Sequence, residues 1–490
     1  MRGLDRSGLK GVCLSALTEN EIERIHVAAL RILAQTGIVI HDEAVLTLLD
    51  KAGCQVDREA RRVCLSAQVI TDAVATAPPV VNLYNRLGEQ AMTLGAGPLH
   101  ARTSSGATGV LDLDSGRRRE PSSQDAVDAA RLADALPHIH GVSTMAVQPA
   151  DVPVTAVDVR TVKIALSNTI KPLGYVCLNE PLIEFVLDMA TTVVGGEEAL
   201  RERPIITALA ESTSPLQLVS SQLAVLRAFA SRGLPLTLHA HPMAGFTAPV
   251  TLAGELVITH AEILTLVTIA QLIRPGTPVV YGMSSSVPDM RSGANLSGAV
   301  EIGLLGAAVA RLAKRCKLPC LMSSGVDAHR PGAQAMLERL MTLLPPALAG
   351  IDLINLSTLD TKMSFSLEQL VLDETVLSIV ERCLRGISVD DETLALDLIR
   401  EIGPGGAFVA TDHTVRHFRD ELLIPDLVGR ETREAWEAVG APDMRTRARE
   451  KARRILAEHR PPPLPAGVAA QLDEIVKEAE TQSKRGDNSK

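Results

Sequence analysis

Three short apolar runs carry the fold: PIITALA at residues 204–210, PLTLHA at 235–240 and PVVY at 278–281. Each begins with a proline, which a sheet tolerates at the first position of a strand because its missing N–H need not break the ladder there. The prolines that open such runs are Pro137, Pro172, Pro204, Pro235, Pro278 and Pro319. Two more runs, 351–356 and 407–410, complete a predicted set of eight strands.

Helical patterns separate these runs. Apolar residues recur at helical spacing in the intervening segments, among them 216–232, 253–273, 300–314 and 367–385. Strand and helix therefore alternate eight times, which is the order of a (β/α)8 barrel, the TIM barrel. The sequence predicts an α/β fold of this kind over residues 121–420.

The two flanks of the predicted barrel have patterns of their own. Residues 1–120 open with a helical pattern that has a capping-box pair at Thr18 and Glu21, and short alternating strands follow, so we expect an N-terminal α+β cap. Residues 421–481 are charged and helical in pattern, which predicts a C-terminal helical extension. The polar tail, 482–490, is expected to be disordered.

Composition excludes several classes of protein. Hydrophobic residues make up 46% of the 490 and charged residues 22%, as in ordinary globular chains. The formal net charge is -9 and no long Lys/Arg run occurs, so nucleic acid is not an expected partner. The most apolar stretch, about 263–273, is too short to cross a bilayer, and no signal-peptide pattern opens the chain. We expect a cytoplasmic protein without membrane contact, whose seven cysteines are reduced.

In such a barrel the chemistry belongs to the loops after the strand C-termini, and here these loops predict a polar mouth of mixed charge for a small zwitterion or cation. His239 and His241 point to one face of a strand, but no third Cys or His stands at helpful spacing, so we expect them to line the mouth rather than bind metal. Cys316 and Cys320 bracket a turn at the opposite end and are expected in the core. No metal site is predicted.

Several motifs resemble the trimethylamine methyltransferase superfamily, in particular its members without pyrrolysine, since only ordinary residues occur here. The similarity extends over nearly the whole chain. The motifs that carry it are GFTAPVTLAG at 245–254, DMRSG at 289–293, Asp327-Ala328, Gln334, SLEQLVLD at 366–373, GISV at 386–389, EIGPGG at 401–406 and HTVRHFR at 413–419.

The resemblance implies an enzyme that moves a methyl group from a methylated amine to the Co(I) of a corrinoid on a separate protein. Relatives of this kind demethylate quaternary amines such as glycine betaine, so the expected substrate is a quaternary or tertiary methylated amine. No cofactor is expected to be bound tightly by the chain itself. The implied partners are the amine and the cognate corrinoid protein, and the acidic charge and apolar helices are compatible with a homo-oligomer.

Ring faces and carboxylates hold a quaternary ammonium well, which guides the choice of candidate residues. The candidate rings are Tyr175, Phe246, Tyr281 and Phe365, and the candidate carboxylates are Glu211, Asp289, Asp327 and Glu368. Arg291, His329 and Arg330 are the candidates for a substrate carboxylate. His413 matches the family's His-Thr motif and is expected at the substrate or corrinoid face, and Gln334 at the corrinoid face. No residue is assigned as catalytic.

The chain departs from the family pattern in loops that are expected to contact substrate. His329 stands where the family often has Lys, Gly332 where an acid is expected, and Asn355 to Ser357 in place of a glycine-rich turn. The methylated amine is therefore left open. Two other functions stay open as well: a non-catalytic barrel that binds a small cation or a corrinoid protein, and a lyase or decarboxylase that uses the polar mouth for acid–base work.

Overall fold

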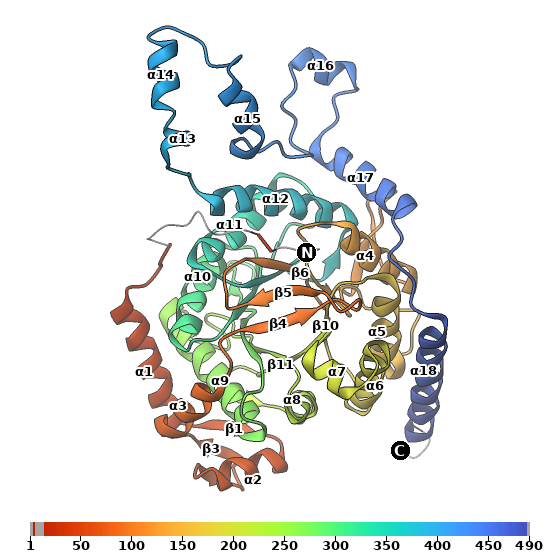
Figure 1. Ribbon diagram of the computed structural model, residues 1–490. Coiled ribbons are helices and arrows are strands. Elements are labelled where there is room, and N and C mark those ends of the chain that lie inside the picture. Colours follow the sequence, from red (N-terminus) through yellow and green to blue (C-terminus); the bar gives the residue numbers. More distant parts are fainter. Residues whose placement is uncertain (1–2, 5–13, 488–490) are drawn as a thin grey trace.

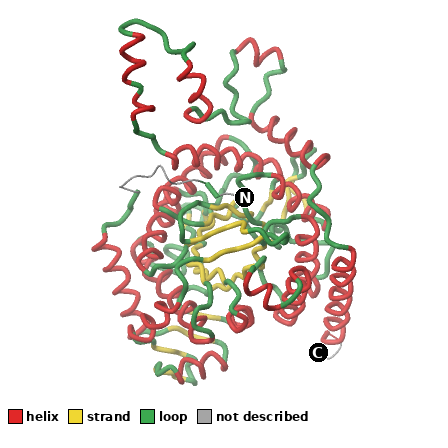
Figure 2. The backbone as a smooth tube through the Cα atoms, in the orientation of Figure 1, coloured by secondary structure: helices red, strands yellow, loops and turns green. Residues whose placement is uncertain are grey.

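The computed structural model describes residues 3–4 and 14–487, and its centre is a barrel of parallel strands (Figure 1). Eight strands pair in the order β6-β18-β17-β14-β13-β11-β10-β9. A parallel bridge between Arg102 and Gly141 joins the two ends of this sheet. Figure 2 shows the strands at the centre with the helices around them. The barrel strands are β6 (His100–Thr103), β9 (Val142–Ser143), β10 (Leu173–Tyr175), β11 (Ile206–Glu211), β13 (Leu236–Ala240), β14 (Val279–Met283), β17 (Cys320–Ser323) and β18 (Leu353–Leu356).

Seven of the eight predicted strands are confirmed, and the eighth is wrong. Residues 407–410 form no strand, and Val409 is 79% exposed. The eighth barrel strand is instead β6. It pairs in parallel with β18, from His100 opposite Leu353 to Thr103 opposite Leu356. The sequence of β6, HART, has no apolar pattern although all four residues are buried. The segment predicted as an N-terminal cap therefore contributes a barrel strand.

The rest of the N-terminal segment covers one side and one end of the barrel. Thr18 caps α1 through the predicted capping box with Glu21. The hairpin of β4 and β5 packs Leu83 and Met92 against Leu321 and Leu353, near the starts of barrel strands, and so closes that end of the interior. Elements of this segment are α1 (Glu19–Gln35), β1 (Ile38–Ile40), α2 (Glu43–Lys51), β2 (Gln55–Asp57), β3 (Arg62–Cys64), α3 (Ala67–Thr76), β4 (Val81–Tyr84) and β5 (Gln90–Leu94).

Helices surround the barrel close to their predicted positions. The helices of this layer are α4 (Ser123–Ala135), α5 (Val157–Asn168), α6 (Ile183–Val194), α7 (Glu197–Glu202), α8 (Ser220–Arg232), α9 (Leu252–Ile273), α10 (Val300–Arg315), α11 (Ala333–Ala349) and α12 (Leu367–Arg385). With 22 residues, α9 is long and apolar enough to cross a membrane, unlike the shorter stretch considered above. However, 78% of its most apolar window is buried, so α9 packs as a core helix.

After α12 the chain leaves the barrel and returns. The four short helices α13 (Asp391–Leu394), α14 (Leu396–Ile402), α15 (Asp412–Glu421) and α16 (Arg433–Ala438) project from the barrel and contain no buried residue (Figure 1). The chain then packs α17 (Met444–Glu458) on α12 and α18 (Ala466–Asp487) on α6. The expected disordered tail is therefore helical up to Asp487, and residues 488–490 lie outside the described part.

Short strands shape the loops at the barrel mouth and the helix layer. They are β7 (Gly109–Leu111), β8 (Arg118–Arg119), β12 (Gln217–Leu218), β15 (Val287–Pro288), β16 (Asn295–Leu296), β19 (Thr358–Leu359) and β20 (Ser364–Phe365), with 3-10 turns η1 (Val154–Ala156) and η2 (Glu180–Leu182). The described cysteines are free thiols, and Cys13 lies outside the described residues.

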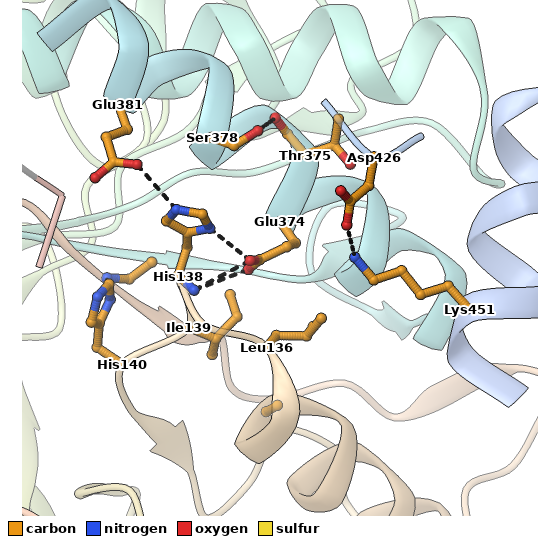
Figure 3. Close-up of polar contacts among 12 residues, drawn as sticks. Leu136, His138, Ile139, His140, Glu374, Thr375, Ser378, Glu381, Asp426 and Lys451 are labelled. Carbon is orange, nitrogen blue, oxygen red and sulfur yellow. Dashed lines mark hydrogen bonds and ion pairs between the residues drawn. The ribbon is translucent and has the colours of Figure 1, made fainter. Parts of the chain in front are cut away.

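A charged cluster fastens α12 to the loop between α4 and β9 (Figure 3). The Nδ1 atom of His138 lies 2.6 Å from Oε1 of Glu374, and its Nε2 atom lies 3.2 Å from Oε2 of Glu381. Burial alone would lower the pKa of His138, but the two carboxylates outweigh burial and raise it to about 9. His138 is therefore positively charged at neutral pH and forms an ion pair with α12.

Candidate active site

A cavity of about 360 Å³ lies at the C-terminal ends of the barrel strands. This is the end at which (β/α)8 enzymes carry their chemistry. A wider groove of about 660 Å³ lies between α5 and Glu480 of α18, but it is outside the barrel and away from the strand ends. The side chains of the cavity that matter below are Arg102, Glu211, His239, His241, Ser284, Asn355 and Lys362.

Arg102 crosses the lower part of the cavity from β6. Its Nε atom donates to Oδ1 of Asn355 at 3.2 Å and its Nη1 atom to Oγ1 of Thr207 at 3.3 Å. Burial lowers the pKa of Arg102 to about 10, so the guanidinium remains charged at neutral pH. None of the carboxylates in the described residues forms an ion pair with it. A Cβ atom on Gly174 would lie 2.4 Å from Nη1, so β10 needs a glycine there.

Lys362 reaches the cavity from a strained turn. Asp360, Thr361 and Lys362 have φ values of 50, 53 and 75°, the left-handed region that side chains rarely adopt. The Nζ atom of Lys362 donates to Oγ of Ser284 at 2.6 Å. Burial lowers the pKa of Lys362 to about 8, although Glu211 and Asp327 favour its charged form. The turn therefore holds a second cation at the cavity.

Asp327 holds this turn in place. Its carboxylate accepts hydrogen bonds from the backbone N–H of Ser297 at 2.7 Å, from that of Gly298 at 2.8 Å and from the hydroxyl of Thr361 at 2.9 Å. Both oxygens are thus occupied by the protein itself. Asp327 positions the loop beside Lys362 and is not a lining residue of the cavity.

His239 and His241 line the cavity from β13, as predicted. A Cβ atom on Gly282 would lie 2.1 Å from Cδ2 of His239, so the ring packs directly on the β14 backbone. Burial, with the positive charge of Arg102 next in importance, holds the pKa of His239 well below its usual range. His241 is exposed to solvent at the mouth, and the protein around it, followed by the charge of Lys362, holds its pKa below the usual value. Both imidazoles are neutral at physiological pH.

Glu211 is the carboxylate that lines the cavity, at the end of β11. Burial raises its pKa, and the positive charge of Lys362 opposes this shift. The cavity therefore combines two cations, Arg102 and Lys362, with the carboxylate of Glu211, which a ligand could contact, and two neutral imidazoles. Such a set can hold a small molecule that carries both an anionic and a cationic end.

Of the four candidate rings, Tyr175 alone belongs to the residues that line the cavity. Tyr175 borders the cavity, but its hydroxyl donates to Oδ2 of Asp158 at 2.9 Å in the helix layer. Tyr281 likewise faces His260 on α9, at 2.9 Å. Successive residues of a strand point to opposite faces. Gly174, just before Tyr175, and Gly282, just after Tyr281, occupy inward positions, so both tyrosines point outward. Phe365 is in the core with 1% exposure, and Phe246 is on a loop with 63% exposure.

The charged candidates are dispersed. Asp289 and Arg291 pair with each other at 3.1 Å on the exposed β15–β16 turn, and that pairing lowers the pKa of Asp289 to about 2. His329 is exposed and pairs with Asp360. Glu368 accepts from Arg445 at 2.8 Å and from Arg449 at 2.5 Å, which joins α12 to α17.

The two residues assigned to the corrinoid face also lie apart from the cavity. Gln334 donates to Glu338 one turn along α11, at 2.7 Å. His413 is on α15 in the projecting helices, beside Glu392 and His417. The structure therefore does not bring these candidates together, and their roles stay predictions.

Sequence reasoning missed Arg102 and did not select Lys362. Arg102 was hidden because its strand was not recognised, and four polar or small residues in a row give no strand pattern. Lys362 follows β19 in a turn at the mouth. The sequence feature that could have indicated Lys362 is a single basic residue after mostly small or polar residues, STLDTK at 357–362.

The family model described as trimethylamine methyltransferase (MTTB) matches residues 10–483. The chain belongs to this family. Trimethylamine methyltransferase MttB of Desulfitobacterium hafniense (strain DSM 10664 / DCB-2) is 32% identical over 487 residues, which is 98% of each chain. Glycine betaine methyltransferase of Desulfitobacterium hafniense (strain Y51) is 30% identical over 463 residues, 94% of this chain and 96% of that one.

The fold comparison agrees with the family. A crystal structure of the hydroxylamine MtmB complex aligns with a TM-score of 0.53 and covers 93% of this chain and 90% of that one. At 10% identity the match shows the shared fold and no more. As a member of the trimethylamine methyltransferase family that matches over nearly the whole sequence given, the protein is an enzyme, a methyltransferase, and the resemblance drawn from its motifs is confirmed. These relatives favour the methyltransferase over the binding-protein and lyase alternatives.

Proposed function

We propose that this methyltransferase takes a methyl group from a small quaternary or tertiary amine that also carries a carboxylate, and passes it to a corrinoid on a separate protein. The observation that carries this proposal is the buried guanidinium of Arg102, which has no carboxylate partner among the described residues. An unpaired buried cation is costly, and a substrate carboxylate would satisfy it through charge-assisted hydrogen bonds. Glycine betaine, the substrate named for one relative, has this combination of charges.

The charges of the cavity favour a zwitterion over a simple amine. Trimethylammonium would add a third cation beside Arg102 and Lys362, with Glu211 as the only lining carboxylate among the described residues. A betaine places its carboxylate on Arg102, in the lower part of the cavity, and directs its onium group toward Glu211 and the opening. The transferable methyl group then faces outward.

The chain contributes orientation rather than proton transfer to this reaction. A quaternary ammonium leaves as a neutral amine, and a tertiary amine does the same when it binds in its protonated form. In either case the chain has no proton to deliver, and the neutral His239 and His241 fit a wall that only shapes the site. Holding a reactant in line with its acceptor can account for about 7 to 11 kcal/mol of a barrier in good cases. Arg102 fixes one end of the substrate and the rim loops exclude water from the other.

The residues present fit a corrinoid that approaches from outside. A corrin ring with its side chains is larger than a cavity of about 360 Å³, so it must dock over the mouth on its own carrier. The corrinoid supplies, when docked, the cobalt that accepts the methyl group. Exposed apolar side chains on the rim loops support contact with that carrier protein: Phe246, Val250, Met290 and Met363. We place both proteins in the cytoplasm, where a reduced corrinoid and free thiols persist.

The test is methylcobalamin formation from Co(I) cobalamin, followed by absorbance, with glycine betaine, proline betaine, carnitine and trimethylamine offered separately. We expect turnover with one or more of the carboxylate-bearing amines and little with trimethylamine. Turnover with trimethylamine alone would contradict the proposed substrate class. No methyl transfer with any of them, where a known relative is active in the same assay, would contradict the reaction itself.

A further inference from the structure

A second group of chemically active side chains lies on the outer side of the barrel, away from the mouth. His26 of α1, His260 of α9 and Cys316 at the end of α10 come together there, with exposures of 7, 0 and 9%. One ligand atom from each residue lies within 4.8 Å of the other two. The Nδ1 atom of His26 and the Nε2 atom of His260 are 2.8 Å apart. Two helices, α1 and α9, and the residue that ends α10 thus bring two nitrogen atoms and one sulfur atom within 4.8 Å of one another.

A hydrogen bond orients the central imidazole. The Nδ1 atom of His260 lies 2.9 Å from the hydroxyl oxygen of Tyr281, on the side of the ring away from His26. With a proton on Nδ1, this contact leaves the lone pair of Nε2 pointing at His26 and Cys316. Histidines that ligate metals are held in this way, with the distal ring nitrogen donating to a fixed oxygen.

The space beside the group can admit an ion. A cavity of about 390 Å³ adjoins it and is lined by His26 and Cys316, with apolar side chains such as Val74 and Leu264. This cavity gives an ion a path and room for a water molecule. Arg315 and Lys317 also line this cavity, and the guanidinium of Arg315 is paired with the carboxylate of Glu23 at 2.7 Å, which offsets its charge.

We propose that His26, His260 and Cys316 bind one Zn²⁺ ion, with water from the adjoining cavity as the fourth ligand. Two imidazoles and one thiolate form a ligand set that zinc prefers, at about 2.0 to 2.1 Å for nitrogen and about 2.3 Å for sulfur. Tetrahedral coordination needs the two imidazole nitrogens about 3.3 Å apart, so they must separate by about half an ångström from their distance of 2.8 Å. The sulfur of Cys316, which lies within 4.8 Å of both nitrogens, must come to about 3.6 Å from each.

Binding changes the protonation of the group in a defined way. The Cys316 thiol loses its proton, so one proton is released per ion bound. The hydrogen bond between the two imidazoles breaks, and the N–H that made it moves to the other nitrogen of its own ring. The ion then connects α1 of the N-terminal segment to α9 and α10 of the helix layer. This site is independent of the methyl-transfer reaction proposed for the barrel mouth.

The test uses the full chain, freed of metal with a chelator and titrated with Co²⁺ under anaerobic conditions. We expect one equivalent to produce a thiolate-to-Co²⁺ charge-transfer band in the near ultraviolet and the visible bands of a tetrahedral site, and Zn²⁺ to abolish both. Cys316→Ser should remove the charge-transfer band, whereas Cys383→Ser, at an exposed thiol on α12, should leave it unchanged. His26→Gln should weaken Co²⁺ binding at least tenfold.

A second cluster provides a control for nonspecific binding. Glu392, His413 and His417 also bring ligand atoms within 4.8 Å, but they include no thiol. Co²⁺ bound at this second cluster gives no thiolate charge-transfer band. The double substitution His413→Ala and His417→Ala should abolish Co²⁺ binding there. The proposal is overturned if the wild-type chain shows no thiolate band, or if the band survives in Cys316→Ser. Zn²⁺ should also raise the melting temperature of the wild type and not that of Cys316→Ser, a readout independent of cobalt.

Discussion

Individual residues determine what the barrel mouth can hold. Gly174 and Gly282 leave the space that the side chains of Arg102 and His239 fill, since a Cβ atom at either glycine would lie within 2.4 or 2.1 Å of those side chains. The large side chains of Arg102 and His239 thus fit because the neighbouring strand has a glycine, without a side chain, at the facing position. Because successive side chains of a strand point to opposite faces, Tyr175 and Tyr281, each next to one of these glycines, point outward.

Replacing Arg102 should separate carboxylate-bearing substrates from simple amines. Arg102→Met keeps much of the side-chain volume but removes the charge that the substrate carboxylate would meet. Charge-assisted hydrogen bonds contribute about 1.5 to 3 kcal/mol, so kcat/KM for the betaine should fall about 10- to 100-fold. Steady-state kinetics measure this, with Arg131→Met on α4 as the control. An unchanged kcat/KM would place the substrate carboxylate elsewhere.

Glu255, in the first turn of α9, should make stability depend on pH. It is fully buried, and burial raises its pKa to about 7, which the Ser285 hydroxyl offsets only in part. Between pH 4.5 and 7 the folded chain keeps a proton that the unfolded chain has lost, so the free energy of unfolding falls as pH rises. Glu255→Gln should therefore be more stable than the wild type at pH 8, by on the order of 3 kcal/mol.

Urea unfolding at two pH values tests this expectation. The gain in Glu255→Gln should shrink toward zero at pH 4, where Glu255 is protonated in the folded chain and mostly so in the unfolded one. Glu197→Gln, at an exposed position on α7, should show no such dependence. A gain of equal size at both pH values would indicate improved packing instead of ionisation.

Part of the site could be predicted from sequence and part could not, for reasons visible in single residues. Loop positions after strands are countable, so His239, His241 and Glu211 were placed at the mouth correctly. The rings were selected for nearness to strand ends, which does not tell the inward from the outward face. The spacing from an inward-facing glycine does tell them apart, because residues one position away lie on the opposite face. Gly174 faces inward, so the adjacent Tyr175 faces outward.

Among the secondary-structure elements, α12 makes polar connections to several distant segments. It carries Asp373, whose carboxylate accepts from Nε of Arg339 on α11 at 2.9 Å and from the backbone N–H of Ser357 after β18 at 2.8 Å. Both charged side chains of this pair are 0% exposed. Further along the helix, Glu374 meets His138, so α12 connects α11, β18 and the start of β9. The mostly apolar helical pattern predicted α12, but not these partners, which come from distant segments.

Breaking the buried pair should be strongly destabilising. Asp373→Asn leaves Arg339 charged and unpaired in the interior, which typically costs about 3 to 5 kcal/mol. Denaturant unfolding measures the loss. Asp397→Asn removes a pair with Arg400 whose side chains are 95% and 78% exposed, and should change stability by less than about 1 kcal/mol. Equal effects of the two changes would show that the buried pair contributes no more than a surface one.

For the whole molecule, the position of β6 defines what can fold alone. The sequence-based division into a cap up to residue 120 and a barrel after it leaves β6 outside the barrel. A chain of residues 121–490 would lack the strand that pairs with β18 and lies beside β9. We expect it to lose cooperative thermal unfolding and near-ultraviolet circular dichroism. A chain of residues 14–490 should keep both, and cooperative unfolding of the shorter chain would restore the predicted boundary.

The pairing of β6 with β18 also constrains how the protein is made. Arg102 emerges from the ribosome long before Asn355, its partner 253 residues later. At about 5 to 20 residues per second, translation leaves the two edges of this nascent sheet without each other for tens of seconds. Unpaired strand edges invite aggregation in that interval, so biosynthesis of this enzyme should depend on chaperones that shield its first half until the last strand arrives.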